Sequence, residues 1–231
     1  LKVGGSQATN NPDEDHNLHS LDLIESYNPK TNNWSALGKL PKPRSSHEAV
    51  VIGDILYVFG GWDFGNGQGD WLGSISADLS KEKLIWKQLP EMPVDRRAFS
   101  IAHDDRYVYL VGGIDDEGTM NHFDFYDSKK EEWARGPEVP TKGRLKAFGS
   151  AAGYWNGSLY ASDSGNLLHR YDVVEEKWQK GSRLTTARFF HRIVCYNGKV
   201  YVIGGTSQRT GAVKSIEKIN VSNKSSKAGV L

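Results

Sequence analysis

The 231-residue sequence predicts an all-β fold built from a repeated antiparallel unit, and three observations support this prediction. Short apolar runs end in glycine pairs at Gly4-Gly5, Gly60-Gly61, Gly112-Gly113 and Gly204-Gly205. Tryptophans recur 52, 47 and 45 residues apart, at Trp34, Trp86, Trp133 and Trp178. Arginines open the first apolar run of each copy, at Arg44, Arg96-Arg97, Arg144 and Arg188. Because a recurring period in sequence marks a repeated supersecondary unit, the fold is expected to repeat as well.

The clearest single unit is residues 44–61, RSSHEAVVIGDILYVFGG, in which two β-branched runs flank Gly53-Asp54. This pattern predicts a β-hairpin. Equivalent turns are expected at Asp104-Asp105, Asn156-Gly157 and Asn197-Gly198. A third strand then ends in a turn of the Tyr-Asp type, a fourth contains the tryptophan, and a proline-rich link leads to the next copy. In the fourth copy the glycine pair is missing, at Ala161-Ser162-Asp163.

This order of arginine, hairpin, glycine pair, Tyr-Asp turn and tryptophan resembles the kelch repeat, from Val3 to about Val221. The resemblance implies a β-propeller of four-stranded antiparallel blades, an architecture that evenly spaced short strands fit independently. About five blades are represented. They comprise an incomplete blade 1–37, blades beginning at Arg44, Arg96 and Arg144, an incomplete blade 188–221, and a flexible tail 222–231.

With half-blades at both ends, we expect this single domain, residues 1–221, to be part of a six- or seven-bladed ring. The alternative is a five-bladed ring closed by strands from elsewhere. The four repeating tryptophans are expected to pack between blades. Alternation within strands one and two predicts a core that includes Val50, Ile55, Tyr57, Phe59, Ile101, Val108, Leu110, Leu159, Ile193, Val200 and Val202.

Composition excludes several classes of partner and site. The net charge is +1, from 29 basic and 28 acidic residues, so neither a nucleic-acid partner nor an anionic membrane is indicated. No apolar run approaches the roughly 20 residues that a membrane helix needs, so no membrane insertion is expected. The single cysteine, Cys195, excludes an intrachain disulfide and a cysteine-built zinc site, and we expect it in the core. Composition does not constrain the oligomeric state.

The first residues of the repeats suggest a binding face. Since neighbouring strands run antiparallel, the start of strand one and the end of strand two lie at one edge of a blade. Arg44, Arg97, Arg144 and Arg188 are therefore expected around the face that carries the loops after the glycine pairs. Such guanidinium groups suit a carboxylate, a sulfate or an acidic peptide. The alternative is that each arginine pairs with an aspartate or with the backbone of a neighbouring blade.

Two further features lie on or near this face. The loop 62–73, WDFGNGQGDWLG, places Trp62, Phe64 and Trp71 among glycines. These rings suit stacking on a sugar or capture of a peptide side chain, unless the loop folds onto its own apolar residues. His47 and His191 lie three residues after an arginine, where a histidine is either an acid/base group or a half-buried structural residue.

We therefore predict a non-catalytic kelch-repeat binding or scaffold module that recognises a protein segment or a glycan. No cofactor and no metal is expected. The alternative is a carbohydrate-active kelch enzyme, such as a mutarotase of an acidic sugar, with arginines on the carboxylate and a histidine moving the proton. A glutamate facing either histidine in the channel favours the enzyme. Resemblance to secreted bacterial kelch proteins slightly favours a secreted or periplasmic location. The predicted ligand-binding residues are Arg44, His47, Trp62, Trp71, Arg97, Arg144, Arg188 and His191.

Overall fold

The computed structural model describes residues 1–11, 17–65, 69–141 and 143–221. The predicted flexible tail and residues 66–68 of the loop 62–73 lie outside this described part. Within it the strands form five antiparallel sheets and three short hairpins, with no α-helix. No helix among the described residues is therefore long and apolar enough to cross a bilayer. These findings confirm the all-β prediction.

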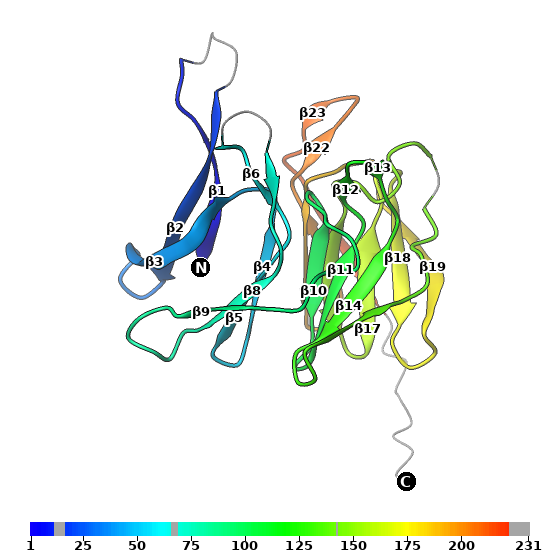
Figure 1. Cartoon of the computed structure of the whole chain (residues 1–231). Helices are drawn as coiled ribbons and strands as arrows, with labels where there is room; N and C mark the ends of the chain where they lie inside the picture. The colour runs from blue at the N-terminus through cyan, green and yellow to red at the C-terminus, as the bar shows by residue number, and fades with distance from the viewer. Residues whose placement is uncertain (12–16, 66–68, 142, 222–231) are drawn as a thin grey trace.

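Each of the five sheets is one blade, and the blades follow one another along the chain (Figure 1). Blade 1 consists of β1 (Lys2–Ala8), β2 (Leu18–Asn28) and β3 (Asn33–Arg44). Blade 2 consists of β4 (Glu48–Ile52), β5 (Ile55–Phe59), β8 (Ile75–Asp78) and β9 (Trp86–Gln88). Blade 3 consists of β10 (Ser100–His103), β11 (Tyr107–Val111), β14 (Phe123–Asp127) and β15 (Glu132–Arg135).

Blade 4 consists of β16 (Ala151–Trp155), β17 (Ser158–Ser162), β18 (Leu167–Asp172) and β19 (Lys177–Arg183). Blade 5 consists of β20 (Arg192–Tyr196), β21 (Lys199–Ile203) and β24 (Ile216–Asn220). The three hairpins are β6 (Trp62–Asp63) with β7 (Asp70–Trp71), β12 (Ile114–Asp115) with β13 (Gly118–Thr119), and β22 (Thr206–Ser207) with β23 (Gly211–Ala212). We call the end of the blades that carries these hairpins the hairpin face (Figure 1, top).

The hydrophobic core is divided among the blade interfaces. Each of four clusters joins two consecutive blades, as when Phe59 of blade 2 packs with Leu110 and Tyr126 of blade 3. Every core residue predicted from the sequence is buried or half-buried in such a cluster, which confirms the prediction. Cys195 is half-buried against the cluster between blades 4 and 5, where burial raises the pKa of its thiol to about 12.

Backbone hydrogen bonds also link the blades. In each of blades 2 to 5, the residue two positions after the opening arginine, or after the residue that replaces it, has a positive φ. These residues are Ser46, Ala98, Gly149 and Phe190. The amides of the last three donate to the carbonyl of the equivalent residue in the preceding blade: Ala98 to Ser46 (2.9 Å), Gly149 to Ala98 (3.2 Å) and Phe190 to Gly149 (2.8 Å). The left-handed backbone conformation costs about 1–2 kcal/mol for a residue with a Cβ atom. Its recurrence therefore reflects this inter-blade bonding.

The glycine pair allows the next blade to approach. Gly60 has a φ of 56°, and a Cβ atom there would lie 2.5 Å from the carbonyl oxygen of Arg96 and 2.9 Å from the ring of Phe99. The amide of Gly61 donates to the same Arg96 carbonyl at 2.8 Å. Only glycine combines this conformation with such close packing.

Three of the four repeating tryptophans join consecutive blades, as predicted for all four. The indole Nε1 of Trp86 donates to the carbonyl of Lys39 (2.9 Å), that of Trp133 to Pro90 (3.0 Å), and that of Trp178 to Pro137 (2.8 Å). In each case the acceptor lies at the end of the preceding blade. Trp34 differs, since its side chain is 54% exposed and its indole has no acceptor among the described residues.

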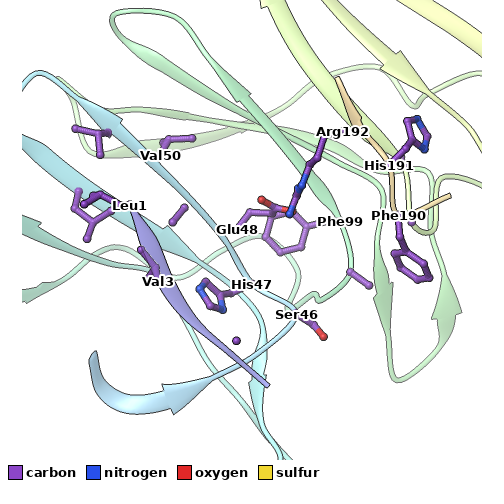
Figure 2. A pocket seen from close by; sticks show the side chains of 17 residues that line it. Leu1, Val3, Ser46, His47, Glu48, Val50, Phe99, Phe190, His191 and Arg192 are labelled. Atoms are coloured by element: carbon purple, nitrogen blue, oxygen red, sulfur yellow. The ribbon is translucent and has the colours of Figure 1, made fainter. Parts of the chain in front are cut away.

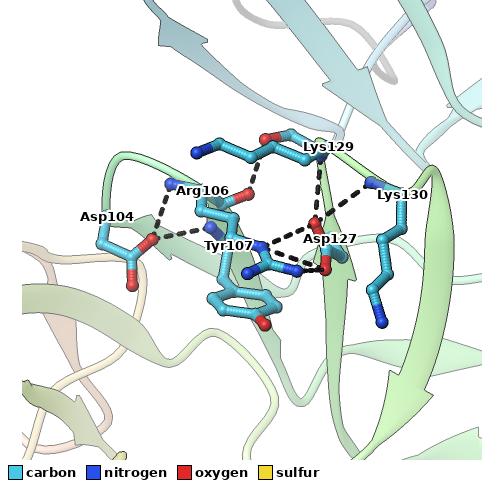
Figure 3. Close-up of polar contacts among 7 residues, drawn as sticks. Asp104, Arg106, Tyr107, Asp127, Lys129 and Lys130 are labelled. Carbon is cyan, nitrogen blue, oxygen red and sulfur yellow. Dashed lines mark hydrogen bonds and ion pairs between the residues drawn. The ribbon is translucent and has the colours of Figure 1, made fainter. Parts of the chain in front are cut away.

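The turns opposite the hairpin face use the polar residues that the sequence indicated. Asn156 and Asn197 both have positive φ and precede a glycine that also has positive φ. At the predicted Asp104-Asp105 turn, the Asp104 carboxylate accepts from the amides of Arg106 and Tyr107. Arg106 in turn holds Asp127 with both Nε and Nη2 (Figure 3). This pair fixes the β10–β11 turn against the β14–β15 turn.

Candidate binding face

Arginines at the start of strand one point into the blades and bond the glycine pairs. Arg44, Arg96 and Arg188 are at most 3% exposed. Each donates from Nη1 to the carbonyl of the first glycine of its own blade: Gly60 at 2.8 Å, Gly112 at 3.3 Å and Gly204 at 3.1 Å. Arg44 and Arg188, two of the predicted binding residues, are thus enclosed in blades 2 and 5. Their position matches the alternative raised from the sequence, in which arginines bond the backbone.

The partners of these arginines differ from blade to blade. Arg96 forms an ion pair with Asp124, and Arg188 forms one with Glu217. Asp124 and Glu217 each pair with the residue two positions before the first glycine of the pair, on the neighbouring strand. In blade 2 that residue is Val58, and it pairs with Ile75 instead of an acid. Arg44 consequently has two carbonyl acceptors, Gly60 and Gly73, but no carboxylate among the described residues. Burial lowers the pKa of this guanidinium to about 10.

The predicted residue Arg97 is the neighbour of the buried Arg96 and faces the other way. Its Cζ lies 3.5 Å from the ring centroid of Trp62 and 5.9 Å from that of Trp71. Phe64 lies 5.0 Å from Trp62, between ring centroids. We call these four half-buried residues the Trp-Arg cluster. Burial lowers the pKa of Arg97, while the charge of Asp116 opposes that shift.

The Trp-Arg cluster connects two hairpins. Trp62 and Trp71 pair across β6 and β7, with their rings 6.1 Å apart. The indole Nε1 of Trp71 donates to Asp116 at 3.1 Å, in the turn of the hairpin β12–β13. The folded loop thus packs partly on itself, as the alternative from the sequence described, and still presents partly exposed rings on the hairpin face.

Arg144 lies on the same face but does not occupy the position of the buried arginines. The equivalent position in blade 4 is Ala147, because Gly149 is the residue with positive φ. Arg144 is exposed, and its carbonyl accepts from Thr119 Oγ1 at 2.8 Å. It lines a cavity of about 1030 Å³ between blades 4 and 5. We call this the hairpin-face cavity.

Blade 4 has replaced the buried arginine and its carboxylate partner as well as the glycine pair; the sequence showed the missing glycine pair but assigned the arginine to Arg144. Asp163 and Ser164 stand where other blades have the glycine pair, at the end of the gap predicted at Ala161-Ser162-Asp163. His169 stands where blades 3 and 5 have Asp124 and Glu217, and its Nε2 contacts Asp163 Oδ2 at 3.1 Å. Burial opposes ionisation of Asp163, but hydrogen bonds from His169 and from the backbone lower its pKa overall. The signal in the sequence was the joint loss of arginine and glycine.

The two predicted histidines occupy equivalent positions in blade interfaces. A Cβ atom on Gly61 would lie 2.6 Å from His47 Cβ, and one on Gly205 would lie 2.7 Å from His191 Cβ, so each histidine packs on its own glycine pair. His191 Nε2 contacts Ser162 Oγ of blade 4 at 2.6 Å. Burial, followed by the nearby arginines, lowers the pKa of each histidine to about 4. Both rings are therefore neutral at pH 7.

The channel between the inner strands contains a different charged pair. Glu48 and Arg192 point toward each other, with Phe99 beside them, and His191 points away (Figure 2). Arg192 Nη1 donates to Glu48 Oε1 at 2.7 Å. The pair lines a cavity of about 650 Å³ that also includes the inter-blade residues Ser46 and Phe190. Burial raises the pKa of Glu48, and Arg192 opposes that shift.

The eight predicted residues thus fall into four groups. Trp62, Trp71 and Arg97 meet in the Trp-Arg cluster, and Arg144 lies elsewhere on the hairpin face. Arg44 and Arg188 lie inside blades, and His47 and His191 lie between blades. The cluster and the hairpin-face cavity are the parts of the hairpin face that present side chains to a ligand.

Comparison with known proteins places the chain among kelch repeats. A family model described as the KLHDC2/KLHL20/DRC7 Kelch-repeats domain matches residues 2–205, and the Kelch motif matches residues 187–227. Alpha-scruin of Limulus polyphemus is 24% identical over 241 residues, covering 96% of this chain and 25% of that protein. Kelch-like protein 15 of Homo sapiens is 23% identical over 191 residues, covering 83% of this chain and 26% of that protein. The chain therefore spans about a quarter of these relatives.

A solved structure has a similar fold. The structure of YjhT superposes with a TM-score of 0.78 at 18% sequence identity. The match covers 96% of this chain and 78% of YjhT. At this identity the likeness shows the fold alone, which agrees with the arrangement of blades described above.

Proposed function

Since the chain belongs to the kelch-repeat family, we propose that it is a non-catalytic binding module that holds a segment of a partner protein on its hairpin face. The family is consistent with a protein-binding scaffold. The observation that supports the location is the Trp-Arg cluster, in which the guanidinium of Arg97 stacks on Trp62 beside Trp71. Tryptophan and arginine are enriched among the residues that dominate binding energy at protein interfaces.

The cluster is also built for rigidity. The rings come from a two-stranded hairpin, and Asp116 of the next hairpin holds the indole of Trp71. Arg97 is bridged to Ile114 through the backbone, which fixes the start of its side chain. Contact groups that are ordered before binding lose little conformational entropy when a partner arrives. Loops on a rigid β-scaffold are a common place for such contacts.

A peptide library displayed on phage and selected against the protein tests this proposal. Peptides that bind are expected to lose at least tenfold in affinity on Trp71→Ala or Arg97→Ala. Trp34→Ala is the matched control, because Trp34 is an exposed tryptophan on blade 1 outside the cluster. Peptides that bind all three variants alike would show that the cluster is not the binding site. A parallel glycan array covers the other ligand class, and binding of a glycan that depends on Trp71 would replace the protein segment.

A second candidate function, catalysis on an acidic sugar, is favoured by the channel cavity alone. Arg192 suits a substrate carboxylate, and Glu48 is a partly desolvated acid beside it. Both predicted histidines also line this cavity, but His191 Nε2 contacts Ser162 Oγ at 2.6 Å and burial lowers the pKa of each ring to about 4. Nuclear magnetic resonance of anomer exchange in sugar acids is the test. Accelerated exchange that Glu48→Gln abolishes would support the enzyme and overturn the non-catalytic proposal.

A further inference from the structure

Blade 4 lacks the hairpin that blades 2, 3 and 5 carry on the hairpin face. In those three blades the chain after strand two runs out through β6–β7, β12–β13 or β22–β23. In blade 4 a tight turn joins β17 directly to β18. The Asp163 carboxylate closes that turn by accepting from the amides of Gly165 and Leu167, at 2.8 and 3.0 Å. The repeat is therefore shortened at this one place on the face.

The shortened turn leaves the hairpin-face cavity beside it. Ser164 and Asn166 of the turn line the cavity, as do residues 143–145 that lead into blade 4 and residues 207–210 of the next hairpin. Its volume of about 1030 Å³ is at the upper end of the range of ligand pockets. The cavity thus arises where a hairpin is missing from an otherwise regular set.

The lining of the cavity is positively charged and rich in hydrogen-bonding groups. Arg144 and Arg209 are exposed, and neither side chain has an ion-pair partner among the described residues. Among the residues that the structure describes, no aspartate or glutamate lines the cavity. Hydroxyl and amide groups supply the remaining polar surface, from Ser164, Asn166, Thr185, Thr186, Ser207, Gln208 and Thr210. Two guanidinium groups that lack ion-pair partners among the described residues, together with neutral hydrogen-bonding groups, are suited to binding carboxylates.

The cavity is joined to the Trp-Arg cluster through one hairpin. Asp116, at the turn of β12–β13, contacts Trp71, and Thr119 in β13 of the same hairpin contacts the backbone of Arg144. An extended segment crossing this hairpin can therefore reach both places. Residues 116 and 119 are only three apart, and an extended chain advances about 3.3 Å per residue.

We propose that the hairpin-face cavity binds acidic side chains of the partner segment, with Arg144 and Arg209 holding the carboxylates. This inference rests on the proposed function and specifies its ligand: a segment with an aromatic or apolar residue for the Trp-Arg cluster and glutamates or aspartates a few residues away. Arg209 was not among the residues predicted from the sequence. Its role depends on the short turn of blade 4.

The first test uses the capped peptide acetyl-Gly-Glu-Glu-Glu-Gly-amide as probe and amide chemical shifts of the whole protein as readout. The probe is expected to shift the resonances of residues that line the cavity, and the matching glutamine peptide to bind at least fivefold more weakly. Arg144→Gln and Arg209→Gln are each expected to weaken binding three- to tenfold. Lys81→Gln removes an exposed cation on blade 2 outside the cavity and is expected to leave binding of the probe unchanged. Equal binding of both peptides, or undiminished binding by the double variant, would overturn the inference.

A second variant tests the cavity itself without removing charge. Ser164→Trp places a large side chain at the shortened turn and is expected to reduce binding of the glutamate probe at least threefold, with an unchanged thermal midpoint. Full binding by this folded variant would contradict the proposed site. The two proposals can also fail separately. Selected peptides that depend on Trp71 but not on Arg144 or Arg209 would leave the proposed function standing and refute this inference.

Discussion

The buried arginines bind different partner groups in repeats whose sequences look alike. Arg96 and Arg188 each have a carboxylate, whereas Arg44 has carbonyl oxygens and blade 2 has Ile75 at the position of the acid. A buried charge is costly unless it is paired and hydrogen-bonded. In blade 2, two short hydrogen bonds from Arg44 to carbonyl oxygens offset this cost, and burial lowers the pKa of Arg44.

Arg96→Met is expected to destabilise the protein more than Arg44→Met. Removing Arg96 leaves Asp124, whose side chain is 0% exposed, with Arg135 as its one remaining ion-pair partner among the described residues, so a loss of about 3–5 kcal/mol is expected. Removing Arg44 strands no carboxylate among the described residues, and a loss of about 1–3 kcal/mol is expected from the unsatisfied carbonyls. Urea unfolding measures both, with Lys81→Gln as a control expected within about 0.5 kcal/mol of the wild type. Equal losses in the two arginine variants would contradict this account.

His191 is expected to make stability fall as the pH falls from about 6.5 to about 4. In the folded protein its pKa is lowered to about 4, from an ordinary value of 6.5, so the unfolded chain binds more protons in that window. The stabilising contribution of the neutral ring is therefore complete above pH 6.5, decreases between pH 6.5 and pH 4, and does not change further below pH 4. The loss attributable to this histidine is at most about 3 kcal/mol.

Unfolding by urea at a series of pH values measures this effect. His191→Gln keeps a polar group near Ser162 but does not titrate, so its stability is expected to depend less on pH between 4 and 6.5 than that of the wild type. His103→Gln is the control, because His103 is exposed. An identical pH dependence in the wild type and His191→Gln would rule out the lowered pKa.

At the scale of the element, consecutive blades are held by a repeated set of contacts. Every interface has an apolar cluster; the first three add the hydrogen bond of a fourth-strand tryptophan, and the last three add an amide-to-carbonyl bond between left-handed residues. These contacts explain why glycine pairs and tryptophans recur together. The glycines admit the neighbouring backbone, and the tryptophan holds the outer edge.

Trp133→Phe separates the hydrogen bond from the ring packing. The indole donates to Pro90 at 3.0 Å, and its ring packs edge-on against Phe59 at 5.6 Å. Loss of the bond is expected to cost about 1 kcal/mol, with most of the packing kept. Trp34→Phe is the matched control and is expected to cost less than about 0.5 kcal/mol, because Trp34 has no acceptor among the described residues. Chemical unfolding compares the two, and equal costs would show that the hydrogen bond contributes nothing.

At the scale of the whole molecule, the channel brings together strands that are far apart in the sequence. Arg192 of blade 5 reaches Glu48 of blade 2 across 144 residues. The contact joins inner strands that belong to different sheets, so it depends on how the blades are arranged relative to one another. The hairpin face is likewise a property of the assembly, because the Trp-Arg cluster takes residues from two blades and the hairpin-face cavity from their neighbours.

A double-mutant cycle on Glu48→Gln and Arg192→Gln measures the cross-channel pair. The Arg192 side chain is 71% exposed, so the coupling energy is expected to be about 0.5 kcal/mol and to shrink in 1 M salt. Urea unfolding at low and high salt provides the four stabilities. A coupling of zero at low salt would mean that blades 2 and 5 do not face each other in this way.

The sequence alone was sufficient for features encoded locally. Strand runs, Asn-Gly turns, glycine pairs and repeating tryptophans each depend on a few neighbouring residues, and the predicted repeat, core and blade packing were confirmed. The periodic pattern also located the loop whose rings form the Trp-Arg cluster. The position of Trp62 directly after a glycine pair was enough for that prediction.

Only the tertiary structure decided which charged residues face inward. Arg96 and Arg97 are adjacent and chemically identical, yet the strand direction and the left-handed Ala98 send one into the blade and the other onto Trp62. The register between strands placed Ile75 where blades 3 and 5 have an acid, and it placed His169 beside Asp163. The missing hairpin of blade 4 became a cavity only because the segment leading into blade 4 and the hairpin of blade 5 line the space beside the short turn. Such relations depend on contacts between residues far apart in the chain, which a local pattern does not specify.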